Sequence, residues 1–278
     1  MNKSLIKIMH TWKTRFAVTI LSIGMLAPLA AHAGRSCEEN KPTTETIERG
    51  LTLAVQTTKE LDASGQDVVL LARKGQDLSK HGVQYSHLGF AYRQPDGNGG
   101  YSWRVLHKLN HCGTGVAAIY RQGLAEFYLD DLWRYEAAYV VPKPEIQKRL
   151  LALFADIGHA TCLNQRQYSL VSYAWGQKYQ QSNQWALETL AMAISSEVNS
   201  REEAQEWLQS QGYRPTAIRL GPLTRLGARI SKANVAFDDH PPSKRFADVI
   251  ETVTADSVFI WMNNANLGSQ AVIIRPRR

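Results

Sequence analysis

Apolar and polar residues follow two different periods in the first half of the chain. Residues 44–63 carry apolar side chains at helical spacing and are followed by a serine and a glycine, which predicts an amphipathic helix. Residues 67–73 and 85–93 are short runs rich in apolar residues, which favours strands. The turn-forming segment QPDGNGG, residues 94–100, joins the second run to another extended run over residues 101–109. We therefore expect a β-hairpin across this turn.

The second half changes from strand character to helix character. Two further strands are expected first, at residues 115–120 and 135–141. Amphipathic helices are then predicted over residues 144–157 and 184–196, with Ser182 or Asn183 as the N-cap of the latter. This succession of strands and then helices favours an α+β fold.

The C-terminal part begins with a clearly delimited helix. Ser200 and Glu203 have the spacing of a capping box, and Gly212 is a natural stop. Residues 217–262 mix helix and strand character with less certain boundaries. We expect an α+β domain over residues 34–200 and a mixed α/β extension over residues 201–278 packed on it.

The first 33 residues have the features of a cleavable signal peptide. Four basic residues and no acid precede an apolar run of 14 residues, Phe16 to Leu29, and the A-x-A sequence ends at Ala33. The run is shorter than the roughly 18 residues typical of a membrane span. We therefore expect signal-peptide cleavage, a periplasmic location and no stable membrane insertion afterwards.

Charge argues against a nucleic-acid partner. The leader holds four of the 32 Lys and Arg residues and none of the 25 acids, so the net charge of +7 falls to +3 after cleavage. Basic residues are scattered among acidic ones, without the clusters typical of nucleic-acid binding. An apolar content of 44% is enough for one core, or for one core with a smaller appended lobe.

Three cysteines, Cys37, Cys112 and Cys162, remain after cleavage. In an oxidising compartment, this odd number predicts one disulfide and one free thiol. The sequence leaves open which two cysteines pair.

Two polar clusters are candidates for a site but have simpler explanations. His107, His111 and Cys112 are zinc-ligand types, yet the two histidines are four residues apart in a segment that reads as extended. Asp239 and His240 lie in the sequence DDHPP, which suits an acid–base site and equally suits a tied loop. We expect no metal and no cofactor.

A family resemblance emerges from the order of these motifs. The strand with YSHLGF, a second strand with a polar residue at His107, and a helix opening after QQSN resemble the NlpC-like papain-fold peptidases and amidases. The order is similar to their circularly permuted branch, in which the histidine strand precedes the nucleophile helix. The resemblance covers roughly residues 67–196. It implies an antiparallel sheet packed against helices.

The resemblance also implies residue roles. His87 matches the general base, His107 the residue that orients the base, and Ser182, followed by Asn183, the position of the cysteine nucleophile. A helix N-terminus favours a nucleophile because its free N–H groups stabilise an anion. Serine is a weaker nucleophile than a cysteine thiolate and depends on its base. The substrate-binding residues expected beside these are Tyr85, Trp185, Asp239 and His240.

Two classes of function therefore remain. The first is a hydrolase that uses Ser182, His87 and His107 on an amide, ester or thioester bond of an envelope peptide, glycan-peptide or acylated ligand. The second is a degenerate papain-like domain that binds such a ligand or a partner without cleavage. The simplest structural explanation is that Ser182 caps a helix and His87 is a core histidine. We expect Glu188 to lie on a solvated or salt-bridged helix face.

Overall fold

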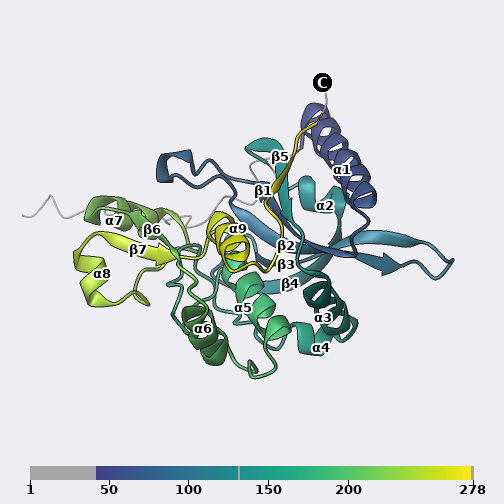
Figure 1. Ribbon diagram of the computed structural model, residues 1–278. Coiled ribbons are helices and arrows are strands. Elements are labelled where there is room, and N and C mark those ends of the chain that lie inside the picture. The colour runs from purple at the N-terminus through teal and green to yellow at the C-terminus, as the bar shows by residue number, and fades with distance from the viewer. Residues whose placement is uncertain (1–41, 131, 277–278) are drawn as a thin grey trace, which may run out of the picture. The chain divides into compact units, whose positions relative to one another are not determined.

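The computed structural model describes residues 42–130 and 132–276 (Figure 1). These residues belong to one structural unit. The expected signal peptide, residues 1–33, lies outside the described residues, and so does Cys37. Periplasmic export therefore stays a prediction from the sequence.

A six-stranded antiparallel sheet forms the centre of the fold, with strand order β4-β3-β2-β1-β5-β8. The expected hairpin is confirmed: β2 and β3 pair from Phe90 and Leu106 to Pro95 and Tyr101. The α+β class predicted from the sequence is also confirmed. The strands of this sheet are β1 (Val68–Lys74), β2 (His87–Pro95), β3 (Tyr101–Asn110), β4 (Ala117–Gly123), β5 (Arg134–Val140) and β8 (Val272–Ile274).

The helices begin and end largely where the capping residues predict. Gly65 adopts the left-handed conformation that closes α1, with φ 68°, and Ser200 and Glu203 form the capping box of α6. The helices are α1 (Thr44–Ser64), α2 (Leu124–Tyr128), α3 (Pro144–Ala155), α4 (Ile157–Ala160), α5 (Ser182–Ile194), α6 (Arg201–Ser210), α7 (Pro222–Ser231), α8 (Pro242–Phe246) and α9 (Ala255–Asn264), with a 3₁₀ turn at Ser79–His81.

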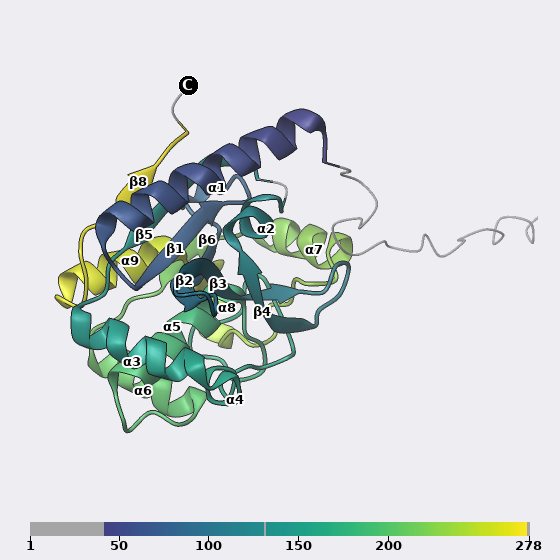
Figure 2. The same cartoon turned by 90° about the vertical axis from the view of Figure 1, so that its right-hand side faces the viewer.

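Helices cover both faces of the sheet, which lies between α1 and α5 in Figure 2. Alternate residues of each strand face opposite sides. Leu88 and Phe90 belong to a core with α3, α5, α6 and α9, whereas Ala91 belongs to a core with α1 and α2. The strand pattern of the sequence therefore reflects a sheet that is buried on both faces.

The C-terminal region is not confined to an appended lobe. α6, α9 and β8 contribute to the two cores of the central sheet. A smaller lobe consists of β6 (Thr216–Arg219), which pairs with β7 (Val249–Thr252), together with α7 and α8. Its own small core contains Val235, Phe237 and Ile250.

The two cysteines in the described residues, Cys112 and Cys162, differ in whether they form a disulfide. Cys112 is disulfide-bonded, whereas Cys162 is a free, exposed thiol. Cys162 is therefore the unpaired cysteine that the odd number predicted. No helix among residues 42–130 and 132–276 is long and apolar enough to cross a membrane.

Candidate active site

Ser182 is the first residue of α5 and not its N-cap. The N-cap is Gln181, whose side-chain oxygen accepts the Asn183 N–H at 3.0 Å. The prediction that Ser182 or Asn183 caps this helix is therefore wrong. Gln181 has a side chain long enough to fold back over the first turn, and its amide also donates to the Val253 carbonyl. The Ser182 hydroxyl is consequently not used for capping.

The Ser182 hydroxyl instead contacts His87, 95 residues earlier in the chain. Ser182 Oγ lies 3.1 Å from Nδ1 of His87, the first residue of β2. His87 Nε2 lies 2.8 Å from His107 Nδ1 on the neighbouring strand β3. The structure thus brings together the three residues of the sequence hypothesis.

A glycine makes room for the second histidine. Gly89 directly precedes Phe90, which pairs with Leu106 of β3, and a Cβ atom on Gly89 would lie 2.9 Å from the His107 Cβ. Only a residue without a side chain fits at this distance. The glycine of the SHLGF sequence therefore allows β2 and β3 to hold the two imidazoles in contact.

The chain of contacts continues to Gln122 on β4. His107 Nε2 lies 2.8 Å from Gln122 Oε1. We did not identify Gln122 from the sequence, because the strand expected there ended at residue 120. The strand in fact extends to Gly123. We call the four residues Ser182, His87, His107 and Gln122 the relay.

The amide oxygen of Gln122 sets the direction of every hydrogen bond in the relay. This oxygen only accepts, so His107 Nε2 must donate to it. A neutral His107 then accepts at Nδ1, which requires His87 to donate from Nε2. A neutral His87 in turn accepts at Nδ1 from the Ser182 hydroxyl. The result is an imidazole poised to take the serine proton.

Burial keeps both imidazoles neutral. Desolvation, followed by the charge of Arg73 and the neighbouring His107, lowers the pKa of His87 well below its usual value. Desolvation and the Arg73 charge lower the pKa of His107 to about 3, and the hydrogen bond that His107 donates to Gln122 opposes this shift. His87 is therefore a neutral base at pH 7.

Aromatic and cationic side chains surround the relay. The Phe127 ring lies 5.8 Å from the ring of His87 and 5.2 Å from that of His107, between centroids. The buried Arg73 guanidinium lies over Phe127, donates to its carbonyl and pairs with Asp130. These contacts restrict the orientations of both imidazoles.

Tyr168 is a further neighbour that sequence reasoning missed. Burial raises the pKa of its phenol to about 12, and a hydrogen bond with Ser182 opposes this rise. The phenol is thus a neutral hydrogen-bonding group beside the serine. Tyr168 lies outside the predicted strands and helices, so no periodicity pointed to it.

The remaining candidate residues lie elsewhere. The Tyr85 hydroxyl faces Glu136 at 3.5 Å, and Trp185 is fully buried against Phe90. Asp239 accepts the Tyr173 N–H at 2.8 Å and lies 3.0 Å from Nδ1 of the adjacent His240. None of these contacts involves a relay residue, and Trp185 fills the core.

Comparison with known protein families assigns the chain to a family. Residues 60–262 match the family described as "Uncharacterized protein conserved in bacteria (DUF2145)". The chain belongs to the DUF2145 family. No curated protein and no solved structure matches it. The matched segment of this DUF2145 protein includes all four relay residues.

A second polar network of the DUF2145 protein surrounds Glu188. The buried carboxylate pairs with Arg201, 2.8 Å from Nε, and accepts from Gln205 at 2.7 Å. Gln180 donates to it as well and accepts from Lys108 Nζ at 2.6 Å. Of the two environments expected for Glu188, the salt-bridged one is confirmed and the solvated one is wrong.

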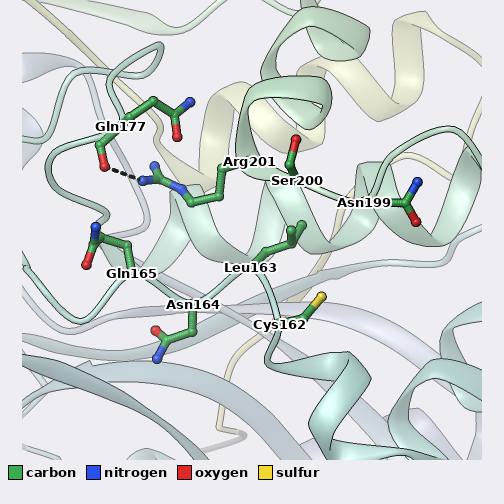
Figure 3. A pocket seen from close by; sticks show the side chains of 8 residues that line it. All are labelled: Cys162, Leu163, Asn164, Gln165, Gln177, Asn199, Ser200 and Arg201. Atoms are coloured by element: carbon green, nitrogen blue, oxygen red, sulfur yellow. Dashed lines mark hydrogen bonds between the residues drawn. The ribbon is translucent and has the colours of Figure 1, made fainter.

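A surface pocket of about 370 Å³ lies beside this network. Figure 3 shows the side chains that line it. Cys162 and Asn164 line it opposite Arg201, whose guanidinium is directed at the Gln177 carbonyl, 2.9 Å away. The guanidinium also donates to Glu188 and to the carbonyls of Gly176 and Tyr179. Arg201 thus ties α6 to the loop that precedes α5, and the relay residues do not line this pocket.

Metal ligands are not clustered in the part of the chain that the structure describes. Residues 42–130 and 132–276 contain no group of three or more His, Cys, Asp or Glu side chains arranged to hold a metal ion. His107 contacts His87 and Gln122, and the backbone of His111 participates in the turn before β4. The zinc alternative gains no support from this arrangement.

Proposed function

We propose that this DUF2145 protein is an exported hydrolase of the papain-like class, in the permuted NlpC-like arrangement. Ser182 attacks an amide, ester or thioester carbonyl, and His87 is the general base. The observation that carries the proposal is the one-way hydrogen-bond relay from Ser182 to Gln122.

The first half of the reaction forms an acyl-enzyme. Ser182 Oγ bonds to the carbonyl carbon while its proton passes to His87 Nδ1, 3.1 Å away. The resulting imidazolium still donates from Nε2 to His107. The positioning residues His107 and Gln122 keep the ring in place and support its charge, because each presents an acceptor.

The N-terminus of α5 faces the charge that develops on the substrate. The first N–H groups of a helix have no intrahelical acceptor, and the helix dipole adds partial positive charge there. Ser182 is at this position in a helix of 13 residues. The Tyr168 phenol, which interacts with Ser182, is a further polar group beside the nucleophile.

Collapse of the tetrahedral intermediate breaks the carbonyl–heteroatom bond. The leaving amine, alcohol or thiol takes the proton from His87. Water then attacks the acyl-serine, His87 accepts a proton from the water, and the acid product departs as Ser182 regains its proton. The step needs neither a metal ion nor a redox partner.

The proposed substrates are peptides, glycan-peptides or acylated molecules of the cell envelope. This assignment rests on the signal-peptide features of residues 1–33 and on the family resemblance. The antiparallel sheet followed by the nucleophile helix is consistent with that resemblance. The chemistry of the relay suits all three carbonyl types.

One observation favours a second candidate function, binding of an envelope ligand without cleavage. Ser182 and His87 are 4% and 8% exposed, and the pocket of Figure 3 does not include them. A domain that binds a ligand but no longer cleaves it would retain the relay residues as buried structural contacts. Covalent reactivity of Ser182 separates the two functions.

The test is intact-mass labelling of the chain from residue 34 onward with a small serine-reactive fluorophosphonate. We expect one adduct on the wild type and none on Ser182→Ala or His87→Ala. Ser169→Ala is the matched control, because Ser169 is a buried serine whose hydroxyl bonds to the Ala236 backbone. Loss of labelling in Ser169→Ala would contradict the hydrolase proposal. The absence of an adduct on the folded wild type would contradict it as well.

Gln122 provides a test of the relay direction. Gln122→Glu retains an acceptor for His107 Nε2, whereas Gln122→Leu removes it. We expect Gln122→Glu to label at a rate near that of the wild type and Gln122→Leu to label about ten-fold or more slowly. Equal rates for the two variants would show that the direction of the relay does not activate Ser182.

A further inference from the structure

The outer face of α7 is apolar and exposed. Leu223, Leu226 and Ile230 are 84%, 55% and 56% exposed. Their spacing of three and four residues places them on one side of the helix. Three large aliphatic side chains in a row on a surface helix indicate an interaction site.

This apolar face is not needed to attach α7 to the fold. Ala228 is the residue of α7 that packs against the small core around Val235, Phe237 and Ile250. At 3.6 residues per turn, Ala228 projects from nearly the opposite side to Leu223 and Ile230. The helix therefore has an inner face that packs and an outer apolar face that does not.

The two helices carry basic residues and no acid, namely Arg225 and Arg229 in α7 and Lys244 and Arg245 in α8. Arg225 pairs with Asp248 and Lys244 with Glu251, whereas Arg229 and Arg245 are exposed. Arg225 donates to the Arg245 carbonyl at 2.6 Å, which joins the two helices. Figure 1 shows α7 and α8 flanking β6 and β7, far from α3, and α8 ends with Phe246, which is 88% exposed.

Helix α1 has a similar exposed apolar face but a different balance of charged residues. α1 also exposes aliphatic residues at helical spacing, Ile47, Leu51 and Val55. Among its charged residues, however, the acids Glu45, Glu48, Glu60 and Asp62 outnumber the bases Arg49 and Lys59. An anionic surface would therefore attract α7 and repel α1.

We propose that α7 and α8 form a peripheral binding surface for a bilayer of anionic phospholipid. The helix α7 lies in the interface, its three aliphatic side chains enter the boundary between headgroups and acyl chains, and the exposed Arg229 and Arg245 contact lipid phosphates. Phe246 adds an aromatic side chain from the same lobe. This inference stands on α7 and α8 alone and is independent of the proposed hydrolase activity.

The test is co-sedimentation of the protein from residue 34 onward with vesicles of phosphatidylglycerol and phosphatidylethanolamine. We expect binding that weakens as salt is raised and that is absent from phosphatidylcholine vesicles. Leu223→Asp with Leu226→Asp should weaken binding by about ten-fold or more. The matched control, Leu51→Asp with Val55→Asp in α1, should bind like the wild type.

Other outcomes overturn the proposal. Equal binding by the α7 variant and the wild type would show that this face does not contact lipid. A dimer that the α7 substitutions dissociate, with no vesicle binding by the wild type, would assign the face to a second copy of the chain. Urea unfolding of the α7 variant should match that of the wild type, which shows that the variant is folded without relying on the hydrolase proposal.

Discussion

Substitution of Gly89 by alanine tests how closely the backbone positions the relay. The added Cβ would lie 2.9 Å from both the His107 Cβ and the Val105 Cγ1, and 3.2 Å from the Leu106 carbonyl oxygen. All three atoms belong to β3. The strand is hydrogen-bonded on both sides, so β3 has little freedom to withdraw from β2.

The expected magnitude follows from these distances. Ordinary contact begins near 3.4 Å, so the strands must separate by about 0.5 Å at this point. Overpacking of this kind in a well-packed core costs about 1–3 kcal/mol. Because misplacement by about 1 Å lowers catalytic rates by up to about 100-fold, we expect Gly89→Ala to slow Ser182 labelling by about ten-fold.

Urea unfolding and fluorophosphonate labelling measure the two effects separately. Gly227→Ala, in α7, is the matched control because its added Cβ would meet nothing within 4 Å. Alanine is the better helix former, so this variant should be more stable by about 0.5–1 kcal/mol and label normally. Wild-type stability and labelling in Gly89→Ala would refute the argument that Gly89 sets the position of His107.

The other predictions concern buried charges. Arg201→Met leaves the Glu188 carboxylate without its cation and should lower the free energy of unfolding by about 3–5 kcal/mol in urea titrations; a change under about 1 kcal/mol would contradict this. Burial lowers the pKa of Lys108 from 10.5 to about 7 in the folded chain. The unfolded chain therefore binds more protons between these values, and stability should rise with pH across this window, but not in Lys108→Met. Because the pKa of His87 is lowered, labelling of Ser182 should persist below pH 6.5 and decline only as His87 is protonated; a decline centred on 6.5 would indicate a solvated imidazole.

Local patterns in the sequence accounted for most of the secondary structure. The left-handed Gly65 and the Ser200–Glu203 capping box delimit α1 and α6 because caps involve neighbours a few residues apart. The N-cap of α5 was predicted wrongly because that prediction considered only the preferences of neighbouring residues. Serine and asparagine are better caps in general, but the Gln181 side chain is also held by Val253, which is distant in the chain.

The sequence also supplied three members of the relay, through the order of their motifs. It did not supply Gln122 or Tyr168, because neither has a distinguishing neighbour in the chain. Gln122 reaches His107 through the pairing of β3 with β4, and Tyr168 reaches Ser182 from a segment between α4 and α5. Contacts of this kind depend on strand register and loop path, which local preferences do not specify.

The sequence by itself determined the α+β class, the hairpin that carries the histidines and the presence of a helix after residue 183, because hydrophobic period acts over a few residues. Only the tertiary structure decided that Glu188 is a buried ion-pair partner and that the apolar stripe of α7 faces outward. A helical pattern shows that one face is apolar, but what covers that face depends on the elements packed around it.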